Sequence, residues 1–100
     1  MSMSVVIKNG AICEYHNMIQ RSMYGSDMVD VATDGTFIAA LHRNGQVYEY
    51  NAGSNGNIIR IYSVDSSSVR VQVSNGKTVV ITSKGQQMEY TNGNLTAIWS

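Results

Sequence analysis

The chain has 100 residues, of which 43% are apolar and 14% charged, and its formal net charge is zero. This length predicts a single domain with a small core. The scattered charges argue against nucleic-acid binding, which needs a basic patch, and the single Cys13 excludes an intramolecular disulfide and a cysteine metal cluster within the chain.

Short apolar segments separated by glycine turns run along the whole chain. Seven of the nine glycines follow Asn, Asp or Lys. Asn-Gly or Asp-Gly between apolar runs is the strongest local signal for a β-hairpin, whose type I′ turn needs positive φ at both central residues. Proline is absent and helical periodicity is scarce. The chain is therefore predicted to be all-β.

The predicted strands number eleven and fall into units of three, four and four. In chain order they are 5–8, 11–15 and a strand ending at Tyr24; 28–33, 36–42, 46–50 and a strand ending at Tyr62; and 69–74, 77–83, 86–90 and a strand ending at Trp99. We expect one domain, 1–100, made of repeats at approximately 1–25, 26–64 and 65–100. The first repeat lacks the opening strand of the other two.

One phrase recurs in every repeat: a glycine turn followed by a Glu-Tyr pair. The pairs are Glu14-Tyr15, Glu49-Tyr50 and Glu89-Tyr90, at spacings of 35 and then 40 residues. A fixed period in this range indicates a repeat architecture.

The second strand of each repeat is apolar without alternation, as in 5–7, 37–41 and 79–81. A half-solvated antiparallel strand alternates, so a continuous apolar run predicts that neighbouring sheets cover both faces. A β-propeller provides such cover by packing blade against blade. The third strand, which carries the glutamates, is expected to be half exposed nearer the rim.

About three blades would make an open arc, whereas propellers close with four to eight blades. The terminal segments are not polar caps, and Ile98-Trp99 has the composition of a core segment. We therefore expect a homo-oligomer, most simply a dimer that forms a six-bladed ring. The alternative is a β-trefoil, or another small closed β-barrel, which closes as a monomer.

The repeat length and strand pattern over residues 5–99 resemble those of small β-propeller proteins. The resemblance is to short-chain oligomeric propeller lectins of the tachylectin and fucose-lectin type, whose fucose-lectin members bind sugar between blades with Arg, Glu and Trp. It implies ligand-binding residues here, namely Glu49, Tyr50, Arg60, Tyr62, Glu89, Tyr90 and Trp99. The alternative interpretation of the repeated positions is structural, with aromatics packing between blades and each Glu bonding a neighbouring turn or an arginine.

Catalysis has little support, because a nucleophile needs a base and a group that orients it. His16, in a turn, and His42, beside a hairpin, are expected to be exposed. We predict no enzyme, cofactor or metal site, but a non-enzymatic binding or scaffold module for a carbohydrate or a protein. The alternative is a structural or regulatory subunit that assembles with a protein partner. Neither a signal peptide nor a membrane span is indicated, so we expect a cytoplasmic protein without nucleic-acid or membrane partners.

Overall fold

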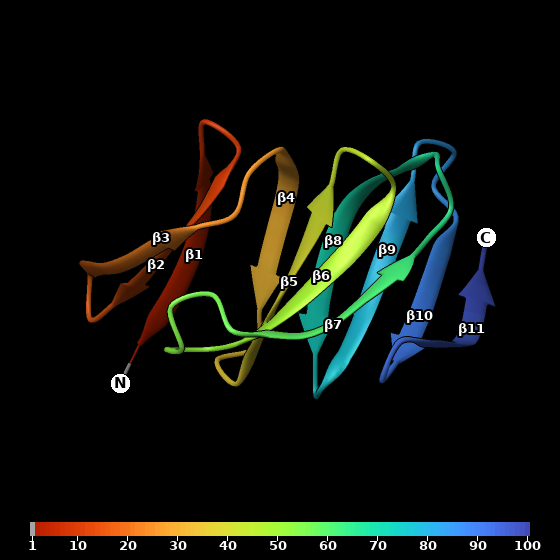
Figure 1. Cartoon of the computed structure of the whole chain (residues 1–100). Coiled ribbons are helices and arrows are strands. Elements are labelled where there is room, and N and C mark those ends of the chain that lie inside the picture. The colour runs from red at the N-terminus through yellow and green to blue at the C-terminus, as the bar shows by residue number, and fades with distance from the viewer. Residues whose placement is uncertain (1) are drawn as a thin grey trace.

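A computed structural model describes residues 2–100, which form eleven strands in three antiparallel sheets (Figure 1). The first sheet contains β1 (Met3–Lys8), β2 (Ala11–His16) and β3 (Ile19–Tyr24). The second contains β4 (Met28–Thr33), β5 (Phe37–His42), β6 (Gln46–Asn51) and β7 (Ile58–Ser63). The third contains β8 (Ser68–Ser74), β9 (Lys77–Thr82), β10 (Gln87–Thr91) and β11 (Asn94–Trp99). The predicted grouping into three, four and four strands is confirmed.

The three sheets stand face to face in a row, with the N-terminus and the C-terminus at opposite ends (Figure 1). β4 packs against both β1 and β8. The strand registers show which strands correspond, because Val5, Ala39 and Val79 each pair with the glutamate of the next strand. β1 therefore corresponds to β5 and β9. Within residues 2–100 the first sheet has no counterpart of β4 or β8, and β1 is its edge strand.

This arrangement is that of propeller blades, as predicted. The β-trefoil alternative is wrong, because the sheets are separate hydrogen-bonded units that meet through their side chains rather than one closed barrel.

The apolar core lies in two layers between the sheets. β5 contributes to both layers, with Ile38 and Ala40 facing the first sheet and Ala39 and Leu41 facing the third. All four side chains are at most 1% exposed, and burying an Ile or a Leu contributes roughly 1.5–3 kcal/mol. The predicted burial of both faces is confirmed for this central strand.

The same prediction is wrong for β1 and β9. Side chains of β1 alternate between half-buried and exposed, and Val6 is 42% exposed. In β9, Val79 and Ile81 are half-buried while their neighbours are buried. Each of these strands belongs to an end sheet, which has a neighbouring sheet on one side only.

The turns follow the sequence signals in part. Asn9-Gly10 has positive φ at both residues, 51° and 80°, as a type I′ turn requires. At Asn44-Gly45 only the glycine has positive φ, 88°, so the predicted type I′ geometry is wrong there. Asn17-Met18 also has two positive values, 54° and 69°, with methionine where other turns have glycine.

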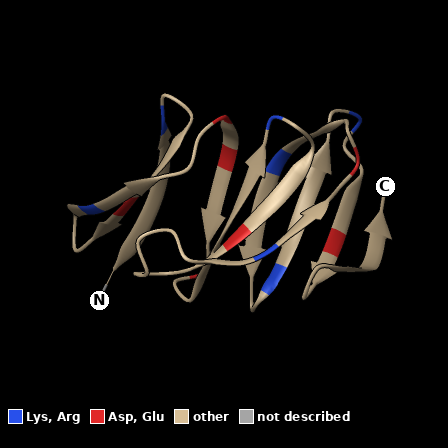
Figure 2. Ribbon diagram, in the orientation of Figure 1, with Lys and Arg blue, Asp and Glu red and all other residues tan. Residues whose placement is uncertain are grey.

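Charged residues are distributed over all three sheets (Figure 2). Among residues 2–100 no helix is long and apolar enough to cross a membrane.

Candidate functional site between the first two sheets

Each interface between sheets contains a buried glutamate. We call the packing of the first sheet on the second the first joint, and that of the second on the third the second joint. Glu14 of β2 is 0% exposed in the first joint, and Glu49 of β6 is 1% exposed in the second. The predicted half exposure of these strands near the rim is wrong at both positions, because the carboxylates point into the joints. A buried carboxylate is strongly destabilising unless hydrogen bonds and a charge partner compensate it.

In the second joint, donors from two sheets surround the carboxylate of Glu49. The Arg60 guanidinium and the Tyr62 phenol, both on β7, donate to it. Thr78 Oγ1, on β9 of the third sheet, donates to Oε2 over 2.8 Å. The Tyr62 ring packs on Tyr90 of β10 with centroids 5.1 Å apart. Charge, hydrogen bonds and aromatic packing thus hold this joint together.

In the first joint, Glu14 has similar contacts but no arginine. The Tyr24 phenol donates to Oε2, and the backbone N–H of Gly53, from the loop between β6 and β7, donates to Oε1 over 2.9 Å. His16 Nε2 lies 3.1 Å from the same Oε1. In the tautomer that carries the proton on Nε2, His16 donates to this carboxylate, which only accepts hydrogen bonds. The Tyr24 ring packs on Tyr50, with centroids 4.9 Å apart.

Burial, and then the hydrogen bond to the glutamate, raise the pKa of Tyr24 and of Tyr62 far above the usual phenol range. Burial likewise raises the pKa of Tyr50 and of Tyr90. Tyr24 and Tyr62 therefore remain protonated donors across the neutral and mildly alkaline range.

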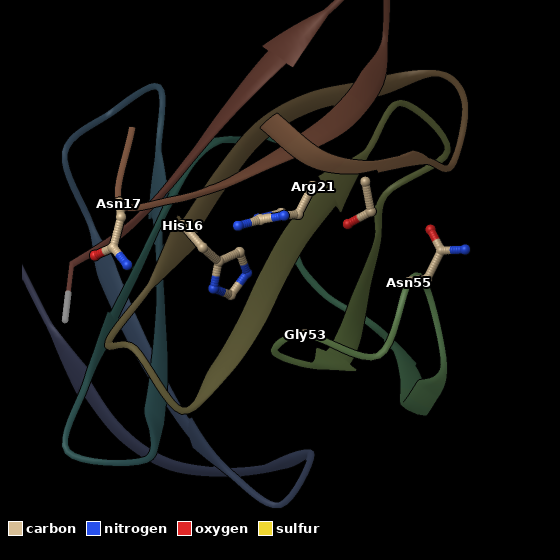
Figure 3. Close-up of a pocket in the computed structure, with 6 residues that line it drawn as sticks. His16, Asn17, Arg21, Gly53 and Asn55 are labelled. Atoms are coloured by element: carbon tan, nitrogen blue, oxygen red, sulfur yellow. The ribbon is translucent and has the colours of Figure 1, made fainter. Parts of the chain in front are cut away.

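The missing arginine leaves a cavity in the first joint. Ser22 pairs with Glu14 in the strand register, as Arg60 pairs with Glu49. In the second joint Arg60 spans the gap and its Nη2 lies 3.4 Å from Asn92 Oδ1. The corresponding region of the first joint is a cavity of about 410 Å³ (Figure 3). It is lined by His16, Asn17, Arg21, Ser22, Gly53 and Asn55.

The loop between β6 and β7 forms one wall of this cavity, and its path is fixed by backbone geometry. Asn55 and Gly56 have φ of 59° and 94°. A Cβ at Gly56 would lie 3.0 Å from the Tyr24 ring, so glycine allows the loop to close on the first sheet. The Ser54 hydroxyl donates to the carbonyl of Asn51 over 2.6 Å. The wall is therefore formed before any ligand arrives.

The polar groups that line the cavity are mostly hydrogen-bond donors and neutral amides. The Arg21 guanidinium and the His16 imidazole lie next to one another, with Asn17 on one side and Asn55 on the other (Figure 3). Such groups suit a ligand rich in hydroxyl, carbonyl or carboxylate oxygens. Among residues 2–100, no group of three or more His, Cys, Asp or Glu side chains is arranged to hold a metal ion.

A second cavity, of about 240 Å³, shares the β6–β7 loop as a wall. His42, Tyr48 and Tyr50 line it as an aromatic row, with centroid distances of 5.3 Å for the first pair and 6.4 Å for the second. These rings provide apolar contact area with polar edges.

The predicted ligand-binding residues fall into two groups. Glu49, Arg60 and Tyr62 come together in the second joint and bond one another, while Tyr50 and Tyr90 are buried against the preceding sheet. The polar groups of Glu49, Arg60 and Tyr62 are thus engaged within the protein, an arrangement that the structural interpretation of the repeat expects. Ligand binding by these residues stays a prediction.

The other two predicted residues, Glu89 and Trp99, lie in the third sheet, on β10 and β11. Glu89 accepts a hydrogen bond from Thr96 Oγ1 over 2.8 Å and lies 3.8 Å from Lys77 Nζ. Trp99 is 47% exposed. These two residues do not join the Glu49 group.

None of the residues that line the first-joint cavity is among the predicted ligand-binding residues. The expected exposure of His16 is wrong, because its side chain is only 22% exposed and contacts Glu14. Comparison of the repeats carries a signal, since Ser22 occupies the position of Arg60. Counting residues along the sequence nevertheless misaligns β3 with β7. The loop after β6 is longer than the turn after β2, and a β-bulge shifts the register after Glu14 and after Glu49.

Antiparallel sheets of three, four and four strands, packed face to face, give the chain a β-propeller-type fold, and solved structures agree. It is similar to BamB from Moraxella catarrhalis, with a TM-score of 0.76 and 18% identity over 96% of this chain and 31% of that one. Sqt1 from Saccharomyces cerevisiae gives 0.71 and 10% identity over 98% and 34%. BBS1N in complex with ARL6DN gives 0.70 and 15% over 91% and 33%. The chain spans about a third of each of these proteins, and the likeness concerns the fold.

Residues 1–55 match the family described as the Helicobacter pylori IceA2 protein, and the chain belongs to this family. The matched segment includes the first sheet and all the residues that line the first-joint cavity. A comparison with curated protein sequences gives no significant match.

Proposed function

We propose that this chain is a non-enzymatic binding module that works within a propeller ring of two copies and holds its ligand in the first-joint cavity. The observation that carries the proposal is the replacement of Arg60 by Ser22 at one of two otherwise similar joints. The replacement opens a cavity of about 410 Å³ that is lined by several polar side chains. A cavity of this size lies within the usual range for ligand sites.

The ligand is a protein segment or a carbohydrate. The donors of Arg21 and the two asparagines suit backbone carbonyls and carboxylates as well as sugar hydroxyls. The solved structure of the similar BBS1N is a complex with ARL6DN, which favours a protein ligand. For a sugar, the neighbouring aromatic row of His42, Tyr48 and Tyr50 would supply the apolar contact. We place the protein in the cytoplasm as part of the proposal.

The test fills the cavity with an arginine, the residue that occupies the corresponding position of the second joint. Ser22→Arg places an arginine opposite Glu14, as Arg60 stands opposite Glu49. Ser83→Arg is the matched control, because it adds the same side chain at an exposed serine in the turn between β9 and β10. A glycan array and a protein pull-down are run with the wild type and both variants. We expect a ligand that the wild type and Ser83→Arg bind and that Ser22→Arg loses. Silence in both assays, or binding unaffected by Ser22→Arg, contradicts the proposal.

A structural or regulatory subunit that assembles with a protein partner is the second candidate. The two uncovered sheet faces at the ends of the row favour it, since Val6 on one and Trp99 on the other are 42% and 47% exposed. A chain that is monomeric alone, and forms a stable complex of defined stoichiometry only with another protein, would support this candidate over the two-chain ring.

A further inference from the structure

The two end sheets present complementary faces. The second and third sheets each press one face, here called the back, against the preceding sheet, and the first sheet's back is uncovered. The first and second sheets each press the other face, the front, against the following sheet, and the third sheet's front is uncovered. Val6 belongs to the open back, and Val79, Glu89 and Trp99 belong to the open front.

We infer that the open front of the third sheet packs on the open back of the first sheet of a second copy, in a third joint built like the two internal ones. This inference rests on the proposed two-chain ring and specifies how the ring closes.

An aromatic pair is the first match. Each internal joint pairs a tyrosine of one front with a tyrosine of the next back, Tyr24 with Tyr50 and Tyr62 with Tyr90. The registers place Trp99 at the position of Tyr62, and Tyr15 at the position of Tyr90. The third joint therefore places Trp99 against Tyr15 of the second copy.

The first sheet's open back has a cavity that could hold the indole ring of Trp99. Its volume is about 450 Å³, and it is lined by Ser4, Val6, Lys8, Tyr15 and Met18. Met18 is 90% exposed in the turn between β2 and β3, at the place where the third sheet has Gly93. In the second joint Gly93 lies against Tyr62, since a Cβ there would be 3.3 Å from its ring. The third joint would differ here, because the Met18 side chain, and not a glycine backbone, would contact Trp99.

A glutamate and a hydroxyl form the second match. Glu49 accepts a hydrogen bond from Thr78 across the second joint. Glu89 holds the position of Glu49 in the third sheet. Ser4 holds the position of Thr78, because Ser4 pairs with Tyr15 as Thr78 pairs with Tyr90. The hydroxyl of Ser4 is thus placed to donate to Glu89 of the second copy.

β8, an edge strand of the third sheet, differs from β4, the corresponding edge strand of the second sheet, in the way that this joint requires. Asp30 and Asp34 accept hydrogen bonds over 2.9 and 3.0 Å from backbone N–H groups of β8 and of the turn that follows it. The corresponding residues of the third sheet are Arg70 and Ser74. A carboxylate at either place would lack the backbone donors of β8 and its turn, because the described part of the first sheet contains no counterpart of β8. The third sheet therefore keeps Glu89 and Trp99, for which the three-stranded first sheet offers partners. It lacks the two aspartates, for which the first sheet, within residues 2–100, offers no such donor.

The number of copies follows from the blade count. Two copies give six blades, within the range of four to eight in which propellers close, whereas three copies give nine.

The experiment measures the mass of the purified chain by analytical ultracentrifugation over a range of concentrations. The wild type is expected near twice 10.9 kDa. Trp99→Ala should weaken the dimer at least about 30-fold, the effect of losing an aromatic anchor from an interface. Ile98→Ala is the matched control, because Ile98 is 52% exposed on the opposite face of β11 and should leave the dimer intact.

Cysteine pairs then test the contact itself. On oxidation, Ser4→Cys combined with Glu89→Cys should give a covalent dimer as its limiting product. Ser22→Cys combined with Glu89→Cys should give none, because Ser22 faces the first joint. A dimer that resists Trp99→Ala and does not cross-link overturns the third joint but leaves the two-chain ring standing. A wild type that is monomeric at every concentration overturns both, and a ladder of longer oligomers overturns closure by two copies. Ligand binding in the cavity is measured separately with Ser22→Arg.

Discussion

Thr78→Val tests whether the hydrogen bond between sheets in the second joint stabilises the fold. Thr78 is 0% exposed and its Oγ1 donates to Glu49 Oε2 over 2.8 Å. Valine keeps the shape of threonine and creates no large cavity, so the main loss is one hydrogen bond to a buried carboxylate, worth about 1.5–3 kcal/mol. Glu49 keeps its contacts with Arg60 and Tyr62. We expect a loss of about 2 kcal/mol from a total near 5–15 kcal/mol.

Urea unfolding and thermal melting measure this loss. The Tm should fall by roughly 8–16 °C, since 1 kcal/mol corresponds to about 4–8 °C in a domain of this size. Thr36→Val is the control, because Thr36 is exposed in the turn before β5 and its change should stay within about 0.5 kcal/mol. Both variants are compared with the wild type at a concentration where all have the same oligomeric state. Equal stabilities for the two variants would refute the role given to the Thr78 hydroxyl.

Three further outcomes are expected. Gly56→Ala should lower the free energy of unfolding by roughly 2–4 kcal/mol, because φ is 94° and the new Cβ would lie 3.0 Å from the Tyr24 ring. Gly35→Ala, with φ of 96° and no atom within 4 Å, should lower it by about 1 kcal/mol. Equal urea midpoints for the two variants would disprove the packing of the loop. Stability should decline as pH rises above 10, because unfolded tyrosines ionise there while the raised pKa of Tyr24 and of Tyr62 keeps both protonated in the fold; urea unfolding across this range measures it, and a flat profile would contradict it. Cys13 is 0% exposed and should react with a thiol reagent at least about 100-fold more slowly in buffer than in urea, and similar rates would show that it is accessible.

The sequence predicts the fold well because its strongest signals are local. Turn pairs such as Asn9-Gly10 set the hairpins, and the continuous apolar run of β5 reports that two sheets enclose it. The same run in β9 is misleading, since the apolar pattern suits burial on both faces while this chain covers one. Coverage depends on which sheets are neighbours, and that is a property of the assembled row.

The site is less visible in the sequence because it depends on register and on contacts between sheets. A glutamate flanked by apolar residues resembles an exposed position on an alternating strand, yet Glu14 and Glu49 are buried because tyrosine and backbone donors reach them from elsewhere in the joint. The cavity arises because Ser22 is small. A sequence motif reveals a reactive side chain more readily than it reveals the absence of a large one. Its position relative to Arg60 emerges only once the β-bulges are known.

The sharing of hydrogen bonds across the joints has a consequence for how the nascent chain matures. The carboxylate of Glu14 receives the N–H of Gly53 and that of Glu49 receives the hydroxyl of Thr78, and both donors leave the ribosome well after their acceptors. Until these donors have been synthesised, each carboxylate remains hydrated, because burying it without its hydrogen-bond partners is unfavourable. Each joint is therefore expected to close only after its donor from the following sheet has been synthesised, the first joint after Gly53 and the second after Thr78.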